Sequence, residues 1–457
     1  MSARAVNIVG AGLAGALLAV LFARRGVGVT LYERRPDPRQ SAPERGRSIN
    51  LALAARGLRA LEAAGVLEEV RPLLIPMRGR MVHELGGPTR FLPYGQRPHE
   101  LLWSVPRLGL NRVLTDAAAA RGVELNFEHA ARGADFARGT VLVEDLRSGQ
   151  RRELAMSPVF GADGSGSALR EAMVAAGLGS AREVPLEHLY KELTIPARDD
   201  GRHALDPGAL HIWPRGGYML IALPNADGTF TTTLFLAAHG APVSFATLGS
   251  DQAVRALFDT QFPDVVPLIP DLVAQFAQNP TGRMSTVYAA PWHVAGKALL
   301  VGDAAHAIVP FHGQGMNCAF EDCRVLDDLL AERLPWQQVF ARFDALRRED
   351  TAAIARMAVE NYTEMRDTVR DPLFALQKEL SLELERRLPD RFIPRYSMVM
   401  FHDEIAYAEA ERRGAVQSVL LEEATRGRRA LADVDLPALE RAVIARLEPV
   451  SSPAVRA

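Results

Sequence analysis

The first residues of the chain constrain its fold more than any other part. Residues 6–9 form an apolar run typical of a strand, and this run ends at Gly10. Gly12 and Gly15 follow, and the next residues have the hydrophobic pattern of a helix. In such a series the first glycine permits a tight turn, the second lets the backbone approach a pyrophosphate, and the third lets helix and strand pack closely. The segment predicts a dinucleotide-binding turn.

A carboxylate stands at the distance that this kind of turn requires. A second predicted strand, residues 28–32, ends at Glu33, which can accept two hydrogen bonds from a ribose diol. The pyrophosphate would lie at the N-terminus of the first helix, where free N–H groups and the positive end of the dipole face it. A lone glycine series is weak evidence, but within a strand–turn–helix–strand unit it is strong. This N-terminal unit could bind either NAD or FAD.

The second half of the chain favours FAD. A short apolar strand over residues 298–301 ends at Gly302-Asp303, where a carboxylate can accept hydrogen bonds from a polyol such as a ribityl chain. Residues 313–317 then open a helix. A reduced flavin carries negative charge on its pyrimidine edge, and a helix N-terminus placed there stabilises that anion.

Composition excludes several classes of protein. The 457 residues are 48% hydrophobic, which allows a large core in two or three domains. The formal net charge of -2 argues against general nucleic-acid binding. The two cysteines, Cys318 and Cys323, provide neither a disulfide framework nor a metal-ligand set, which fits a reducing cytoplasm. We expect no signal peptide, because the chain enters its first strand at once, and no membrane-spanning segment, because no apolar run is long enough.

Two groups of arginines allow more than one interpretation. Arg45 and Arg47 follow a polar loop and form either a solvated edge or a cationic lip over the adenylate or an incoming nicotinamide cofactor; their spacing favours the solvated edge. Arg80 lies in residues 75–83, which look like a strand entering a different sheet, and Tyr94 follows on the predicted returning strand. A buried guanidinium needs an anionic partner. A structural acid is the commoner partner and a substrate carboxylate the rarer one.

The order of predicted elements indicates an α/β protein with an insertion. Residues 183–284 read as an antiparallel sheet with a hairpin turn at residues 224–228, and beyond about residue 335 the pattern is helical. We predict a Rossmann-type FAD-binding domain, an inserted antiparallel β-sheet substrate domain and a C-terminal helical region. The predicted limits are residues 1–72, 100–180 and 285–370 for the first, 73–99 and 181–284 for the second, and 371–457 for the third.

Three signals in this order resemble the group A flavoprotein monooxygenases with the p-hydroxybenzoate hydroxylase fold: Gly10–Gly15, Asp163-Gly164 and Gly302-Asp303. More specific motifs, within residues 5–410, resemble the kynurenine 3-monooxygenase family. They are residues 46–53, 75–81, 190–193, 211–215, 311–317 and 361–366. Eukaryotic members of that family carry a C-terminal membrane anchor, and this sequence departs from them there. It resembles a soluble bacterial form, which we expect in the cytoplasm.

The resemblance implies hydroxylation of L-kynurenine to 3-hydroxykynurenine, with NADPH and O2, through a flavin C4a-hydroperoxide. It implies that Arg80, Tyr94 and Asn361 hold the substrate carboxylate and that Tyr396 closes the pocket. It also implies that Glu364 and Met365 lie nearby and that His312 contributes from the flavin loop. Without the resemblance, Glu364 reads as one half of a helix-surface salt bridge with Arg366 or its neighbours.

The cofactor implied is non-covalent FAD. The residues expected to bind it are Gly10, Gly12, Leu13, Gly15, Glu33, Arg34, Ala52, Arg107, Asp303, Gly315, Met316 and Asn317. We expect no general acid or base and no metal, because the flavin does the chemistry and the protein excludes water. The sequence has no second G-x-G-x-x-G, so NADPH is expected to bind without a Rossmann site of its own. The oligomeric state stays open.

Other functions remain as alternatives. One is another group A hydroxylase acting on an amino-substituted aromatic acid. A second is a halogenase or an isoprenoid-chain reductase of the same fold, although the tryptophan-rich halogenase signature is not found among the four tryptophans. A third is an FAD protein without hydroxylase activity that presents the β-sheet as an interaction surface. The glycines together with Arg80, Tyr94 and Asn361 argue against the third.

Overall fold

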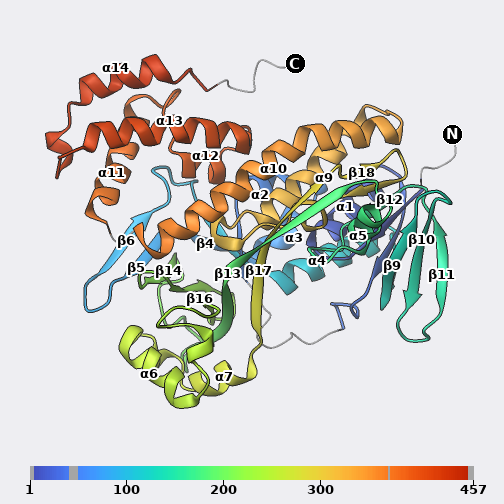
Figure 1. Cartoon of the computed structure of the whole chain (residues 1–457), viewed down its shortest axis with the longest axis horizontal. Helices are drawn as coiled ribbons and strands as arrows, with labels where there is room; N and C mark the ends of the chain where they lie inside the picture. The colour runs from blue at the N-terminus through green and yellow to red at the C-terminus, as the bar shows by residue number, and fades with distance from the viewer. Residues whose placement is uncertain (1–4, 41–49, 369–370, 451–457) are drawn as a thin grey trace.

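The computed structural model describes residues 5–40, 50–368 and 371–450. Arg45 and Arg47, which the sequence favours as a solvated loop edge, lie outside the described residues. Two large sheets lie side by side, and the long helix α10 (Trp336–Arg366) runs along both of them (Figure 1). The last helices of the chain lie along one side of α10 (Figure 1). This arrangement confirms the predicted fold class.

The first sheet contains the predicted dinucleotide-binding unit. Its six strands come from three distant parts of the chain, and all neighbours are parallel except β18 and β19. In order across the sheet they are β18 (His293–Val294), β19 (Ala298–Leu300), β12 (Val159–Gly161), β1 (Ala5–Val9), β2 (Gly28–Glu33) and β8 (Glu124–Phe127).

Helices pack against this sheet, and the innermost one is buried on every side. Residues 15–22 of α1 (Leu13–Arg24) are all buried, because β2 and the helices α2, α4 and α9 surround it. A helix enclosed in this way is hydrophobic all round instead of amphipathic. The other helices of this part are α2 (Ala55–Ala64), α3 (Leu67–Val70), α4 (Arg107–Ala120), α5 (Ala168–Ala175), α8 (Asp303–His306) and α9 (Gly315–Ala331).

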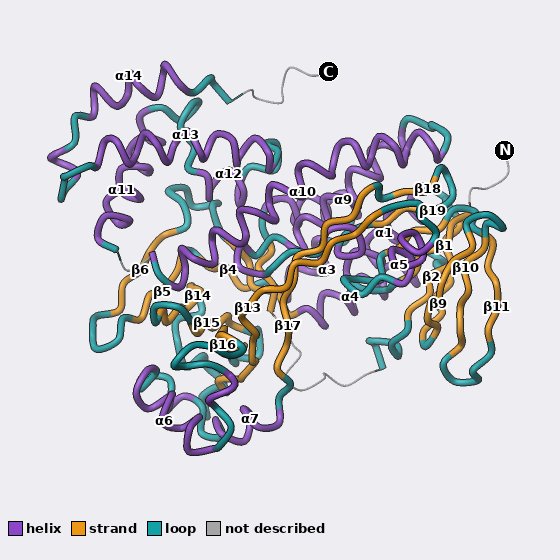
Figure 2. The backbone as a smooth tube through the Cα atoms, in the orientation of Figure 1, coloured by secondary structure: helices purple, strands orange, loops and turns teal. Residues whose placement is uncertain are grey.

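The second sheet is the predicted insertion. Its seven strands are antiparallel except for the pair β14 and β5. The predicted hairpin is present, with the Asn225 N–H donating to the Thr229 carbonyl. β13 and β17 run side by side from this sheet toward the first (Figure 2). In order the strands are β17 (Thr281–Ala290), β13 (Ser180–Ile195), β16 (Phe230–Ala237), β15 (Met219–Pro224), β14 (Ala209–Pro214), β5 (Gly79–His83) and β6 (Thr89–Pro93).

Two helices inside the insertion were not anticipated from the sequence. α6 (Asp251–Gln261) and α7 (Leu272–Gln278) cover one face of the second sheet. Val254, Leu257 and Phe258 of α6 are buried against it, at the spacing of one helical face. The opposite face of the sheet packs against α10, which contributes Ala358, Tyr362 and Met365.

The segment at residues 75–83 is two strands instead of one. β4 (Ile75–Met77) pairs with β7 (Leu102–Pro106) in a small sheet that also contains β3 (Asn50–Leu53), whereas β5 belongs to the seven-stranded sheet. The chain changes sheet at Arg78. Its N–H donates to the Gly208 carbonyl, and its carbonyl accepts the Tyr94 N–H. Tyr94 therefore follows directly after β6, opposite the entry of Arg80 into the sheet.

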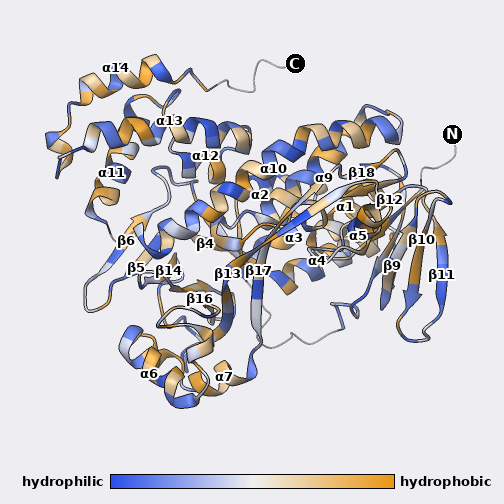
Figure 3. Cartoon of the chain, in the orientation of Figure 1, coloured by the Kyte–Doolittle hydropathy of each residue, from blue (hydrophilic) through white to orange (hydrophobic). Residues whose placement is uncertain are grey.

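A fourth sheet, of three antiparallel strands, projects from the edge of the first. Figure 3 shows the hydrophilic character of β11, which is mostly exposed, and this weak alternation explains why the sequence did not predict it. The strands are β9 (His129–Asp135), β10 (Thr140–Asp145) and β11 (Arg151–Ala155).

The C-terminal region is helical, as predicted. Pro372 is the first residue of α11, and Pro394 immediately precedes α12, because proline is tolerated at a helix start and not in its interior. In the described residues no helix combines the length and the apolar character needed to cross a membrane. The helices are α11 (Pro372–Arg387), α12 (Arg395–Phe401), α13 (Tyr407–Thr425) and α14 (Leu436–Arg446).

Candidate active site

A cavity of about 610 Å³ lies between the two large sheets. One wall is formed where β1, β2, β12 and β19 end, and it includes Val9, Glu33, Ala162 and Val301. The opposite wall comes from β14, β15 and β16 of the second sheet. In open α/β sheets, ligands bind at the carboxyl ends of the parallel strands. The cavity therefore lies where the glycine turn predicts a dinucleotide.

The three glycines of the N-terminal turn have different surroundings. A Cβ on Gly10, which has a φ of +99°, would lie 2.3 Å from the Ala162 carbonyl oxygen, and one on Gly15 would lie 1.9 Å from the Gly10 carbonyl oxygen. A Cβ on Gly12 would meet nothing within 4 Å. Gly10 and Gly15 are thus required by the packing of the chain itself. Gly12 borders open space at the N-terminus of α1, and Leu13 lines the same part of the cavity.

Glu33 lies at the end of β2 with its carboxylate fixed by two backbone groups. Its Oε2 accepts the Ala11 N–H at 2.7 Å and its Oε1 accepts the Arg35 N–H at 2.9 Å. A carboxylate has about four lone-pair positions, so both oxygens can also accept from a diol. Arg34 lines the cavity beside it. Asn111, for which the sequence gave no signal, donates from Nδ2 to the Ala11 carbonyl at 2.9 Å and supports the turn.

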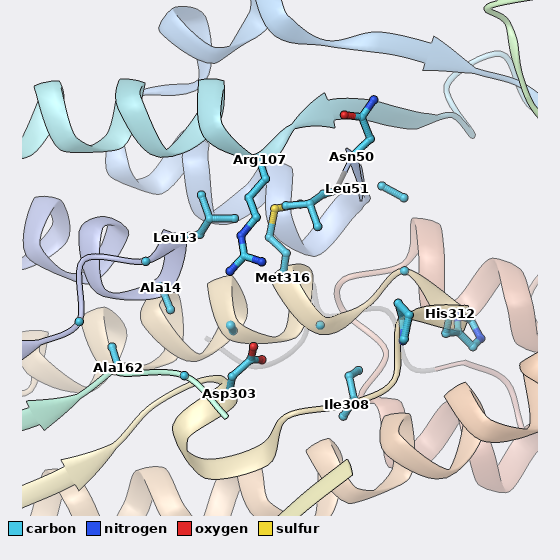
Figure 4. A pocket seen from close by; sticks show the side chains of 18 of the residues that line it. Leu13, Ala14, Asn50, Leu51, Arg107, Ala162, Asp303, Ile308, His312 and Met316 are labelled. Atoms are coloured by element: carbon cyan, nitrogen blue, oxygen red, sulfur yellow. The ribbon is translucent and has the colours of Figure 1, made fainter. Parts of the chain in front are cut away.

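Asp303 and Arg107 point into the cavity from opposite sides, with Met316 near both (Figure 4). Asp303 is the first residue of α8 and is exposed. Gly302 before it has a φ of +61°, and its N–H donates to Asp322 Oδ2 at 3.1 Å. The carboxylate of Asp303 is therefore presented by a rigid turn.

Asp322 belongs to a buried ion-pair network behind that turn. Its Oδ2 lies 2.6 Å from His306 Nε2, and its Oδ1 accepts Arg347 Nε at 2.8 Å. Burial acts against both charges, but the pairing raises the pKa of His306 and lowers the pKa of Asp322. Cys318 lies beside His306 and Asp322, so these three have the residue types of a metal site. Because Arg347 already neutralises the acid, we interpret the cluster as a structural network.

The flavin loop is the segment Pro310–Asn317, which ends in the first turn of α9. Asn317 is fully buried: its Oδ1 accepts the Ala54 N–H at 2.9 Å, and its Nδ2 donates to the carbonyls of Ala52 and Gly313, each at 2.8 Å. It holds the loop to β3 instead of lining the cavity. Ala52, Gly315 and Met316 line the cavity as expected.

Arg80 lines the cavity at the end away from the glycine turn. Its side chain is 7% exposed, and its Nη1 lies 3.3 Å from Oε1 of Glu364 on α10, whose side chain is 28% exposed. Its guanidinium carbon lies 5.0 Å from the ring centre of Tyr396 and 6.0 Å from that of Tyr94. Burial acts to lower the pKa of Arg80, but Tyr396 and Glu364 outweigh it and hold that pKa above its ordinary value.

Three rings form a stack beside Arg80. The Tyr94 and Tyr396 rings are 5.6 Å apart, and the Tyr396 and His312 rings are 5.5 Å apart. Burial raises the pKa of both tyrosines, so both remain neutral hydroxyls. Burial lowers the pKa of His312 to about 3, which keeps this imidazole neutral. Within the described residues, His312 Nδ1 is buried without a hydrogen-bond partner.

Two expected residues of α10 lie behind the cavity wall. Asn361 is 4% exposed and donates from Nδ2 to the Phe311 carbonyl at 2.6 Å, so in this structure it holds the flavin loop. Glu364 contacts Arg80 and is not part of the wall. Met365, in contrast, lines the cavity together with Tyr396 of α12.

The sheet that carries Arg80 contributes further wall residues that the sequence did not identify. Thr231, Thr233 and Phe235 of β16 line the cavity, and Met219 and Ile221 of β15 lie beside them. Alternate residues of a strand point to the same face. The alternation of Thr231, Thr233 and Phe235 was therefore a usable signal once the strand itself had been recognised.

The chain resembles known proteins along nearly its whole length. Residues 3–361 match the family model described as FAD binding domain. The kynurenine 3-monooxygenase of Xanthomonas axonopodis pv. citri is 49% identical over 450 residues, which cover 98% of each chain. That of Stenotrophomonas maltophilia is 48% identical over 446 residues, again 98% of each. This chain belongs to the kynurenine 3-monooxygenase family.

Solved structures share the fold of this monooxygenase at much lower identity. 2-Methyl-3-hydroxypyridine-5-carboxylic acid oxygenase superposes with a TM-score of 0.65 at 21% identity, covering 83% of this chain and 96% of the other. p-Nitrophenol 4-monooxygenase from Pseudomonas putida gives 0.64 at 17% identity, covering 84% and 94%.

The residues that line the cavity of this flavoprotein suit the polar groups of FAD. Gly12 leaves space where a pyrophosphate would lie, and Glu33 and Asp303 present carboxylate oxygens at the places for a ribose and a ribityl chain. A buried oxygen, Asp163 Oδ1, has no hydrogen-bond partner among the described residues, and Asp163 lines the same cavity. These acceptors suit the hydroxyl groups of FAD, and the space at Gly12 suits its pyrophosphate.

Proposed function

We propose that this enzyme hydroxylates L-kynurenine beside its aromatic amine to give 3-hydroxykynurenine, using NADPH and O2. Its curated relatives are kynurenine 3-monooxygenases at 48–49% identity over 98% of the chain. The observation on this chain that carries the proposal is the buried Arg80, which lies beside two stacked tyrosines at one end of the cavity.

Arg80 would bind the substrate carboxylate. A guanidinium offers five N–H donors in a planar fork, so one bond to Glu364 leaves capacity for a carboxylate. Tyr94 and Tyr396, being neutral, would add hydroxyl hydrogen bonds, as a carboxylate taken from water needs a fork donor with further donors. The resemblance implies a place for Glu364 near the substrate ammonium, but here it lies behind the cavity wall, so its role in this proposal is to orient the Arg80 guanidinium.

The aromatic ring of the substrate would lie in the part of the cavity between Arg80 and the flavin loop. Met219, Ile221 and Phe235 form an apolar wall there. Met365 and Tyr396 bring the helical side close. Their task is to keep water from the reacting atoms, since the aromatic amine already supplies electrons to the ring. His312 would pack against the ring as a neutral imidazole.

FAD, when bound, supplies electron transfer from NADPH and the activation of O2. The chain itself contributes Gly10, Gly12 and Glu33 at the adenylate end and Asp303 at the ribityl chain. The first N–H groups of α9, at Gly315 and Met316, would face the pyrimidine edge and stabilise negative charge there. We further propose that NADPH reaches the flavin without a Rossmann site of its own and that the enzyme works in the cytoplasm.

Two measurements on the purified protein test this function. Acid precipitation should leave FAD in the supernatant, whereas FMN there or colour on the precipitate would contradict non-covalent FAD. Adding kynurenine should accelerate NADPH oxidation well above the rate without substrate. If 2-aminobenzoate accelerates it and kynurenine does not, the enzyme is a hydroxylase of another amino-substituted aromatic acid. If no aromatic acid accelerates NADPH oxidation, the proposal that this enzyme is an aromatic hydroxylase is wrong.

A further inference from the structure

The flavin loop contacts the C-terminal helices through one buried glutamine. Gln314 is fully buried between Gly313 and Gly315, which both line the cavity. Its side-chain Oε1 accepts the hydroxyl of Tyr407, the first residue of α13, at 2.7 Å. Its Nε2 contacts Met400 Sδ of α12 at 3.1 Å. Both polar ends of Gln314 are thus used by helices that follow it by about 90 residues.

A second contact holds the start of α13 against the same helix, α9. The guanidinium of Arg56, from α2, lies 3.9 Å over the Tyr407 ring. It pairs with Glu321 of α9 at 2.6 Å and donates to the Ile405 carbonyl. Tyr407 is fully buried, and burial raises its pKa, so its hydroxyl stays a neutral donor. Arg56 covers the Tyr407 ring, and Gln314 accepts its hydroxyl. These two contacts fix the direction of the hydroxyl.

α12 connects this arrangement to the substrate end of the cavity. Tyr396 and Met400 both belong to α12 and both line the cavity. Tyr396 lies against Arg80, and Met400 lies against Gln314. A displacement of α12 at the substrate side would therefore also move Gln314, which immediately precedes α9.

We propose that Tyr407 is a positioning residue for the flavin: through Gln314 it fixes the flavin-facing N–H groups of α9 relative to the helix that covers the substrate. This rests on the proposed function for the kynurenine readouts only. Loss of the hydroxyl leaves Gln314 Oε1 buried without its donor, which favours a shifted loop. The C-terminal helices thereby take part in the alignment of flavin and substrate, beyond closing the pocket.

The test compares Tyr407→Phe, Gln314→Met and the double variant with a control on the same helix. Tyr407→Phe keeps the ring under Arg56 and removes only the hydroxyl. The control is Gln417→Met: Gln417 is buried in α13 and donates to the Ile393 carbonyl at 2.7 Å, away from the flavin loop. Readouts are the FAD dissociation constant of the apoprotein, the 3-hydroxykynurenine formed per NADPH, and the melting temperature.

We expect Tyr407→Phe to weaken FAD roughly tenfold and to divert NADPH oxidation toward H2O2. Gln417→Met should lower the melting temperature to a similar degree and leave FAD affinity and product yield unchanged within about twofold. Because Tyr407 acts through Gln314, the double variant should be no worse than Gln314→Met alone.

Two results would overturn the proposal. One is wild-type FAD affinity and product yield in Tyr407→Phe. The other is an equal loss in Gln417→Met, which would show that any weakening of α13 has the same effect. If the wild-type enzyme does not respond to kynurenine, the proposed function fails, while the FAD titration still decides the role of Tyr407.

Discussion

Nη1 of Arg80 lies 3.3 Å from Oε1 of Glu364, although the two residues are 284 positions apart in the sequence. The sequence offered a structural acid and a substrate carboxylate as alternative partners for this arginine, and its neighbours in sequence contain no acid opposite it. The acid comes from α10 instead. Arg80 lines the cavity and Glu364 lies behind it, so a structural partner and a ligand can use the same guanidinium.

Arg80→Ala should weaken kynurenine binding by tens to thousands of fold, because removing one partner of a buried charge pair typically costs about 2–5 kcal/mol. Arg80→Lys should restore only part of the affinity, since an ammonium cannot reproduce the planar fork. The substrate titration of NADPH oxidation measures both. Decarboxylated kynurenine is the control: if it stimulates the wild type as well as kynurenine does, Arg80 is structural and the substrate pose is wrong.

Gly10→Ala should lower the stability of the apoprotein, whereas Gly12→Ala should lower only its affinity for FAD. Alanine at Gly10 meets the Ala162 carbonyl at a positive φ, so the apoprotein itself should lose more than about 1 kcal/mol of stability. Alanine at Gly12 meets no protein atom within 4 Å, so apoprotein stability should hold. It should still weaken FAD, because an overpacked methyl typically costs about 1–3 kcal/mol. Unchanged FAD affinity in Gly12→Ala would place the pyrophosphate elsewhere.

Gly315→Pro should slow reduction of bound FAD by roughly tenfold, because it removes one N–H that faces the flavin and a charge-assisted hydrogen bond is worth about 1.5–3 kcal/mol. Proline is tolerated at the first position of a helix, so α9 should persist, but it disfavours the αR backbone of Gln314 before it and should also distort the flavin loop. Gly315→Ala keeps the N–H, and its Cβ meets nothing closer than 3.7 Å, so it is the matched control. Normal reduction and product yield in the proline variant would show that this N–H does not face the flavin.

Lys378 of α11 should make stability depend on pH. Burial, aided by the charge of Arg80, lowers the pKa of Lys378 to about 8 from 10.5. Between pH 8 and pH 10.5 the unfolded chain binds this proton and the folded chain does not. The free energy of unfolding therefore rises with pH across this range, and the cost of burying the charged lysine is largest below about pH 8. Lys378→Met removes the penalty. Its melting temperature should exceed that of the wild type at pH 7, and the difference should shrink toward pH 10.5; a difference independent of pH would contradict this.

The sequence predicted the parts of this fold that depend on local rules. The glycine turn, Glu33 and the Gly302-Asp303 turn each follow directly on an apolar strand. Neighbouring residues in the sequence are therefore enough to recognise them. The resemblance added Arg80, Tyr94 and Tyr396, and the structure brings these three together.

What the sequence did not predict depends on distant parts of the chain. Residues 75–83 split because Arg78 bonds to Gly208 and Tyr94, which belong to other segments. The supporting roles of Asn317 and Asn361 follow from hydrogen bonds to Ala52, Ala54 and Phe311, so a residue type alone could not separate a ligand from a scaffold.

The most direct test of the proposed reaction is the product formed by the purified enzyme with kynurenine, NADPH and isotopically labelled O2. Mass spectrometry should find kynurenine heavier by one labelled oxygen atom, with the hydroxyl beside the aromatic amine, in an amount close to the NADPH consumed. NADPH consumption with unchanged kynurenine and only H2O2 formed, or an unlabelled oxygen in the product, would contradict the proposed function.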